Sequence, residues 1–248
     1  MIMRKIAILL FSLLSFVLVA QNSLDSTRIS TTIPVFHADR TAWLQRYQGD
    51  IDRYDRINKE MDDFTCDALF LGSSSFNLWD SLFDDMAPLK VIRRSYGGST
   101  VRDNIYNYQT VARGYKPKTI AIYIENDLGK HPEALTPGEL YDLFRVFIGM
   151  LRNDYPGVPI FFVSLKPSFA KWDQYEDQLI INSLMKDYAE RTPGVEFIDI
   201  RKEMFDENGK LREDIFVSDR LHINAKGYEN WTKAIKPRIM EAIKKEKQ

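Results

Sequence analysis

The segment from Val217 to Asn224 holds the two residues whose types and spacing most directly suggest catalysis. Asp219 lies three residues before His222. A carboxylate in that position can orient an imidazole through one ring nitrogen while the other nitrogen faces a nucleophile. A lone histidine is more often a surface or core residue. His222 stands out because the chain has only three histidines, and neither His37 nor His131 has an Asp at the same spacing.

Three other segments carry groups that could complete such a site. Gly72-Ser73-Ser74-Ser75 presents three successive hydroxyls, which can supply a nucleophile, cradle a phosphate or cap a helix. In Tyr96-Gly97-Gly98-Ser99-Thr100, the glycines either form a tight turn or let the backbone approach a ligand closely. In Glu125-Asn126-Asp127, Asn126 either ends a strand or directs its side-chain amide into a site.

The elements that must position these groups alternate between strand and helix. A capping box at Thr136, followed by Pro137, predicts the start of one helix, and a last helix is expected from about Ala225 to Lys244. This alternation predicts a single doubly wound α/β domain, in which ligands bind outside the carboxyl ends of the strands. Five short apolar runs predict its buried parallel strands, at 68–71, 91–92, 119–124, 160–165 and 195–198.

The composition excludes several classes of protein and site. The chain of 248 residues has 34 basic and 35 acidic residues and a net charge of -1, which argues against nucleic acid as a partner. Its one cysteine, Cys66, cannot form an intramolecular disulfide. With three histidines there is no Cys/His cluster at zinc spacing, so we expect no metal and no cofactor.

The N-terminus has the layout of a secretory signal peptide. Two basic residues precede an apolar stretch from Ile6 to Ala20, and polar sequence follows. Cleavage after residue 20 predicts an exported, periplasmic or extracellular protein without a membrane span; the alternative is a retained anchor, for which the stretch is short. Residues 21–64 are expected to form an N-terminal extension with a surface helix over about 37–63, and residues 65–248 to form the main domain.

Taken in the order in which they follow one another along the chain, the four segments resemble those of the SGNH hydrolases, also called GDSL-type esterases and lipases. The resemblance runs from roughly Asp67 to Trp231. It implies a three-layer α/β/α sandwich around a five-stranded parallel sheet with a flavodoxin-like arrangement. The catalytic residues that it implies are Ser74 as nucleophile, His222 as base and Asp219 as its partner, with an oxyanion hole from the backbone N–H groups of Ser74 and Gly98 and the side chain of Asn126.

Four positions depart from the family pattern. Ser73 replaces the usual Asp, which is outside the triad. Arg93 and Ser95 replace an Asn and a Gly of the glycine segment, so the support of that loop is expected to differ. Ile124 replaces a Gly before Asn126, which places more bulk beneath the expected oxyanion hole.

The resemblance implies a serine esterase that hydrolyses an acyl ester through an acyl-enzyme. The expected substrate is a small-molecule or glycan ester with a short acyl group, acetyl above all, on an extracellular carbohydrate or lipid. Phe76, Trp79 and Tyr96 flank the site segments and could stack on a sugar ring, although aromatic residues after a strand are more often core residues. Three alternatives stay open: a non-catalytic carbohydrate- or lipid-binding protein of the same fold, an acyltransferase, and a flavodoxin-like phosphate cradle at Gly72 to Ser75.

Overall fold

The computed structural model describes residues 42–246. The predicted signal segment and residues 21–41 of the predicted extension, His37 among them, therefore lie outside the described residues. Of the described residues, 44–246 belong to one compact unit. Within the described part of the chain, no helix is long and apolar enough to cross a membrane.

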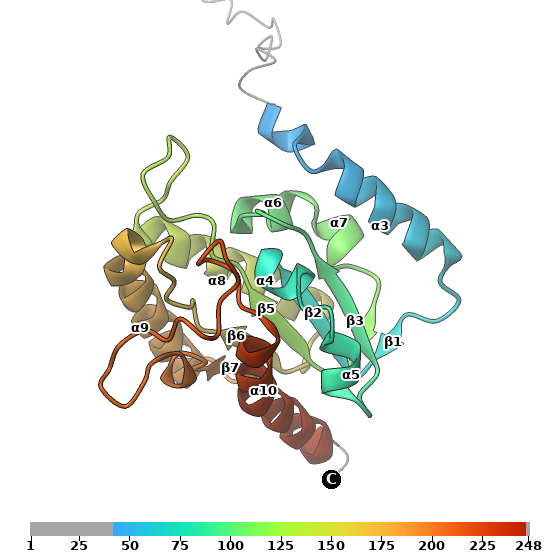
Figure 1. Ribbon diagram of the computed structural model, residues 1–248. Helices are drawn as coiled ribbons and strands as arrows, with labels where there is room; N and C mark the ends of the chain where they lie inside the picture. The colour runs from blue at the N-terminus through green and yellow to red at the C-terminus, as the bar shows by residue number, and fades with distance from the viewer. Residues whose placement is uncertain (1–41, 247–248) are drawn as a thin grey trace, which may run out of the picture. The chain divides into compact units, whose positions relative to one another are not determined.

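A five-stranded parallel sheet forms the centre of this unit (Figure 1). Its strands are the five predicted from apolar runs, and they lie in the order β3-β2-β5-β6-β7. The first strand of this sheet along the chain, β2, thus lies between the second and the third, β3 and β5, which is the flavodoxin-like order. A separate two-stranded sheet, which the sequence pattern did not predict, pairs β1 with β4. The strands are β1 Thr65–Cys66, β2 Ala68–Gly72, β3 Val91–Ser95, β4 Lys116–Pro117, β5 Ile120–Tyr123, β6 Ile160–Val163 and β7 Val195–Ile198.

Helices connect the strands and cover both faces of the sheet. Thr136 caps α8 with the predicted capping box, and α10 fills the predicted C-terminal helix. The helices are η1 Ala42–Gln45, α3 Gln48–Glu60, α4 Ser74–Asn77, α5 Leu82–Met86, α6 Val101–Tyr106, α7 Tyr108–Val111, α8 Pro137–Asp154, η2 Trp172–Gln174, α9 Tyr175–Arg191, η3 Lys202–Met204 and α10 Ala225–Glu246.

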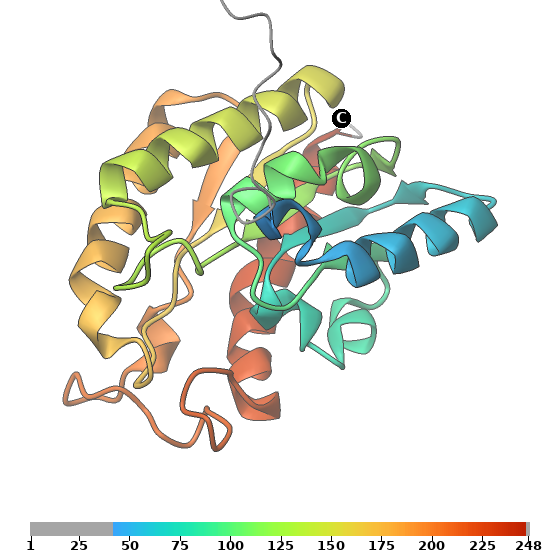
Figure 2. The same ribbon diagram turned by 90° about the horizontal axis from the view of Figure 1, so that it is seen from above.

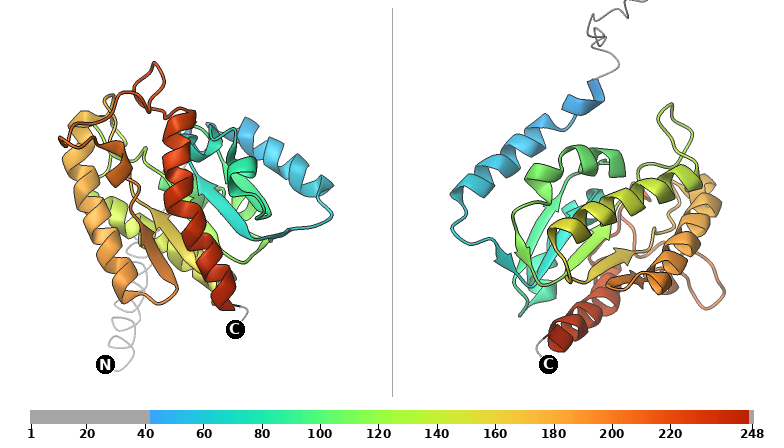
Figure 3. Two further views of the ribbon diagram at one scale, coloured as in Figure 1. Left: turned by 60° about the horizontal axis from the view of Figure 1, so that its bottom comes forward. Right: turned by 180° about the vertical axis from the view of Figure 1, so that it is seen from behind.

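Two apolar clusters, one on each face, make this a three-layer sandwich. One cluster joins the sheet to α3, α6, α7, α8 and α9, and includes the fully buried Phe144 and Phe147 of α8. The other joins it to α4, α5 and α10, and includes Trp231 and Ile235 of α10. Figure 2 shows α8 and α10 on opposite sides of the strands, and the two views of Figure 3 show each face in turn. The predicted fold class is confirmed.

Candidate active site

The hydroxyl segment lies where β2 turns into α4. Gly72 ends the strand against β5, where a Cβ atom would lie 1.9 Å from the carbonyl oxygen of Tyr123. Only glycine permits this close approach, and the chain then turns so that α4 begins at Ser74. Ser74 is 7% exposed, whereas Ser73 and Ser75 are fully buried. Among the three hydroxyl-bearing residues, Ser74 is therefore the one with access to solvent.

Two long side chains fix the backbone of α4. The guanidinium of Arg93 donates hydrogen bonds to the carbonyl oxygens of Phe76 (3.3 Å) and Trp79 (2.8 Å). The Tyr228 hydroxyl, from α10, donates to the carbonyl oxygen of Ser75 (2.8 Å). Arg93, which departs from the family pattern, thus supports the segment that follows Ser74 rather than the glycine segment.

Asp219 and His222 form a tightly bonded pair in the loop before α10. Nδ1 of His222 lies 2.6 Å from Oδ2 of Asp219, and the backbone N–H groups of Leu221 and His222 both donate to Oδ1 at 2.9 Å. Because a carboxylate only accepts, Nδ1 carries the proton and Nε2 is the basic nitrogen. Partial burial acts to raise the pKa of Asp219, but the hydrogen bonds from His222 and Leu221 outweigh it and lower that pKa to about 2.

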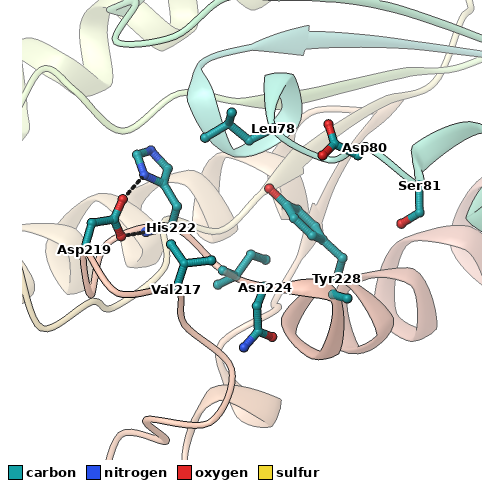
Figure 4. Close-up of a pocket in the computed structure, with 10 residues that line it drawn as sticks. Leu78, Asp80, Ser81, Val217, Asp219, His222, Asn224 and Tyr228 are labelled. Atoms are coloured by element: carbon teal, nitrogen blue, oxygen red, sulfur yellow. Dashed lines mark hydrogen bonds and ion pairs between the residues drawn. The ribbon is translucent and has the colours of Figure 1, made fainter.

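The remaining ring nitrogen of His222 is buried and unpaired. Within residues 42–246, Nε2 of His222 has no hydrogen-bond partner, and no hydrogen bond joins it to the Ser74 hydroxyl. His222 lines one side of a pocket of about 530 Å³, and the other side of this pocket includes Leu78, which directly follows α4, the helix that begins at Ser74. Figure 4 shows the Asp219–His222 pair on one side and Leu78 and Tyr228 on the other.

The glycine and asparagine segments meet beside the end of β2. Gly98 has φ +76°, a left-handed conformation that favours glycine, and it is solvent-exposed. The side-chain amide of Asn126 donates to the carbonyl oxygen of Ser99 at 3.1 Å, so the two predicted oxyanion-hole segments are in direct contact. Both oxygens of Asp127 accept from the backbone N–H of Val101 at 3.0–3.1 Å, and burial raises the pKa of Asp127 to about 7.

A buried ion pair lies next to these segments. Nζ of Lys166 lies 2.8 and 3.1 Å from the two oxygens of Glu125, and the two side chains are 0% and 1% exposed. The Tyr123 hydroxyl donates to Glu125 at 2.5 Å and the Ser75 hydroxyl at 3.4 Å. Burial opposes ionisation of Glu125, but the charges of Lys166 and Lys171 outweigh it and lower its pKa to about 2.

The family of the chain follows from its sequence. The model of the GDSL-like lipase/acylhydrolase family matches residues 62–229. The chain belongs to this family. The acylhydrolase is accordingly an ester hydrolase in general terms, acting on carboxylic esters. No match to a curated protein is found.

Solved structures share the fold of this acylhydrolase. The chain of a structure from Streptococcus pneumonia is 21% identical to this chain and superposes on it with a TM-score of 0.68; the match covers 80% of this chain and 95% of that chain. A GDSL-like lipase from Bacteroides thetaiotaomicron is 17% identical to this chain with a TM-score of 0.65; the match covers 77% of this chain and 98% of the lipase chain. A carbohydrate esterase family 3 protein from Talaromyces cellulolyticus is 14% identical to this chain with a TM-score of 0.58; the match covers 72% of this chain and 98% of the esterase chain.

One expectation from the sequence is wrong. Phe76, Trp79 and Tyr96 are fully buried, so they cannot stack on a sugar ring. Phe76 and Trp79 belong to the aromatic cluster around Trp231, with ring centroids 6.1 Å from it, and they hold α4 against α10. Aromatic residues after a strand are more often core residues, and the burial of all three side chains decides in favour of that role.

The acylhydrolase also has contacts that the sequence did not predict. The bond between Lys166 and Glu125 joins residues 41 positions apart, and Tyr228 reaches Ser75 across 153 positions. No local pattern indicates the partner of either side chain.

Proposed function

We propose that this acylhydrolase is a serine esterase that removes a short acyl group, acetyl above all, from a bulky alcohol such as a glycan. One observation carries the proposal. Nδ1 of His222 lies 2.6 Å from the carboxylate of Asp219, and its other ring nitrogen is buried and unpaired. His222 lines a pocket whose other side includes Leu78, the residue directly after the helix that begins at Ser74. Such a nitrogen is what a hydroxyl nucleophile needs as a base.

In the first half of the reaction, Nε2 of His222 takes the proton of the Ser74 hydroxyl while Oγ attacks the acyl carbon. Asp219 keeps the imidazole in the tautomer that leaves Nε2 basic, and its negative charge stabilises the imidazolium that forms. The imidazolium then gives its proton to the departing alcohol oxygen, which leaves the acyl group on Ser74. In the second half, water attacks this ester while Nε2 of His222 takes a proton from the water. The bond between the acyl carbon and Oγ of Ser74 then breaks, the imidazolium returns the proton to Oγ, and the carboxylic acid leaves.

The negative charge that develops on the acyl oxygen would be stabilised by three donors. They are the backbone N–H of Ser74 at the start of α4, the backbone N–H of Gly98 and the amide of Asn126. Loss of one such donor typically lowers the rate by about a hundredfold or more. The left-handed backbone and exposure of Gly98 support its assignment, since a side chain there would both strain the loop and obstruct the substrate.

The shape and lining of the pocket support the substrate class. Its volume of about 530 Å³ is that of a small-ligand site and leaves room for one sugar-sized alcohol. Leu78 and Val217 provide an apolar wall, while Asp80 and Asn224 add polar groups that can receive hydroxyls. The likeness in fold to a carbohydrate esterase agrees with an esterified glycan.

Hydrolysis of 4-nitrophenyl acetate tests the proposal. We expect turnover of the acetate to exceed that of the octanoate, and Ser74→Ala and His222→Ala to abolish it while the protein stays folded by circular dichroism. Ser183→Ala and His131→Ala remove the same side chains at exposed positions and should leave the rate unchanged. Full activity in Ser74→Ala and His222→Ala would disprove the mechanism, and release of an acylated added alcohol instead of free acid would indicate an acyltransferase.

We further propose export, which rests on the signal-like sequence before Gln21. Expression of the whole chain with its own N-terminus and mass spectrometry of the extracellular and periplasmic fractions test this. A mature protein that starts at Gln21 supports export, and an uncleaved chain in the membrane fraction would indicate a retained anchor.

A further inference from the structure

Lys171 contacts the amide that is predicted to complete the oxyanion hole. It lies between β6 and α9, directly before η2. Its Nζ donates to Oδ1 of Asn126 at 2.8 Å and to the backbone carbonyl oxygen of Glu125 at 3.2 Å. Within residues 42–246, Lys171 has no ion pair with a carboxylate, so its ammonium group is bonded to these two carbonyl oxygens.

The partners of Asn126 fix which way its amide points. Lysine only donates and a backbone carbonyl only accepts, so the oxygen of the amide must face Lys171 and its nitrogen must face Ser99. Nδ2 carries two hydrogens, and one of them goes to the carbonyl oxygen of Ser99. The other has no acceptor among the described residues, which leaves one N–H of Asn126 for a developing oxyanion.

The charge of Lys171 strengthens that donor. A cation on the oxygen of an amide draws electron density toward the oxygen and makes the N–H hydrogens more positive, since hydrogen bonds in a chain polarise one another. An N–H that is both oriented and polarised before the substrate arrives stabilises the transition state without reorganisation. Lys171 therefore can affect the reaction without touching the substrate.

The loop of Lys171 also joins the two halves of the site. The backbone N–H of Ala170 donates to the carbonyl oxygen of Arg220 at 3.2 Å, which lies between Asp219 and His222 in the chain. The backbone N–H of Lys171 donates to the Ser168 hydroxyl at 3.2 Å. The base of Lys171 is thus anchored to the histidine loop while its ammonium group is bonded to the asparagine loop.

We propose that Lys171 is a positioning residue that orients and polarises the Asn126 amide for the oxyanion hole. The proposal rests on the proposed esterase function. Its consequence is that removal of Lys171 should impair the reaction only through Asn126.

A double-mutant cycle between Lys171→Met and Asn126→Ala tests this dependence. In the otherwise unchanged protein, Lys171→Met should lower kcat for 4-nitrophenyl acetate by about tenfold to a hundredfold with little change in KM, since it weakens one donor of the hole. Lys171→Arg keeps the cation and should recover part of the loss. In the Asn126→Ala background, Lys171→Met should change kcat less than about threefold, because residues that act as a unit are not additive. Lys130→Met, which removes an 83% exposed lysine, is the matched control.

A measurement without turnover separates this proposal from the esterase function. In a 1H–15N spectrum, the side-chain amide signal of Asn126, assigned by its loss in Asn126→Ala, should shift in Lys171→Met and stay in place in Lys130→Met. An unmoved signal overturns the proposal, as does an equal loss of kcat by Lys171→Met in both backgrounds. A wild-type protein without Ser74-dependent hydrolysis would instead refute the esterase function, and the amide signal would still show whether Lys171 holds Asn126.

Discussion

Replacing Glu125 with glutamine tests how the protein keeps an ion pair buried beside its candidate active site. Each carboxylate oxygen of Glu125 accepts from Lys166, and the hydroxyls of Ser75 and Tyr123 add one further bond each. Glutamine has nearly the same shape but replaces one of these oxygens with an NH2 group. That group would face two donors, and Lys166 would lose its compensating charge.

The expected loss is large because both side chains are at most 1% exposed. Removal of one member of a buried ion pair typically lowers the free energy of unfolding by about 3–5 kcal/mol. Burial also lowers the pKa of Lys166, so without Glu125 the folded protein would release this proton more readily than the unfolded chain. The unfolded state then binds more protons, and the stability of Glu125→Gln should rise relative to wild type as the pH increases from 6 to 9.

Urea unfolding followed by circular dichroism measures these differences. Adding Lys166→Met to Glu125→Gln removes the unpaired charge and should restore most of the lost stability. Glu190→Gln makes the same substitution in a 65% exposed residue that pairs with Lys186 at 4.0 Å, and it should leave the stability unchanged. A loss below about 1 kcal/mol in Glu125→Gln, or no recovery in the double variant, would show that the buried pair is not structurally important.

Four further substitutions give distinct results. Asp219→Asn should lower kcat for 4-nitrophenyl acetate by about 10³- to 10⁴-fold, since His222 loses its oriented tautomer; a loss below tenfold in steady-state kinetics would contradict this. Because the pKa of Asp127 is raised to about 7 from 3.8, the wild type should lose up to about 4 kcal/mol of stability relative to Asp127→Asn as the pH rises from 4 to 7. Urea unfolding at several pH values in that range measures the difference in stability between the two proteins. A difference that grows with pH supports the prediction, and a constant difference would disprove it. Gly72→Ala should lower the free energy of unfolding by about 2 kcal/mol or more, because its Cβ atom would clash with β5. Gly149→Ala, in α8 with open space around it, should instead raise the free energy of unfolding by about 0.5–1 kcal/mol. Equal effects of the two substitutions in thermal unfolding would refute the clash.

The five strands of the central sheet and the helices α8 and α10 could be predicted because their signals are local. The apolar run from Ile120 to Ile124 indicates a buried strand by itself, and Thr136 and Pro137 mark the start of α8. The two-residue strands β1 and β4 have no such signal, because their pairing depends on where the neighbouring chain segments meet.

The site could be predicted only in part, for the same physical reason. The Asp219–His222 bond spans three residues, so its spacing is visible in the sequence. The bond from Lys171 to Asn126 spans 45 residues and depends on the turns after β5 and β6. Sequence patterns identify the candidate groups, whereas the contacts that orient them arise from the packing of separate strands and loops.

Covalent labelling by a fluorophosphonate probe tests the central assignment most directly, since the probe reacts with an activated serine hydroxyl. After labelling, peptide mass spectrometry should place one adduct on Ser74, and the adduct should be lost in Ser74→Ala and strongly reduced in His222→Ala. An unlabelled protein, or an adduct on another serine that persists in Ser74→Ala, would contradict the assignment of Ser74 as the nucleophile.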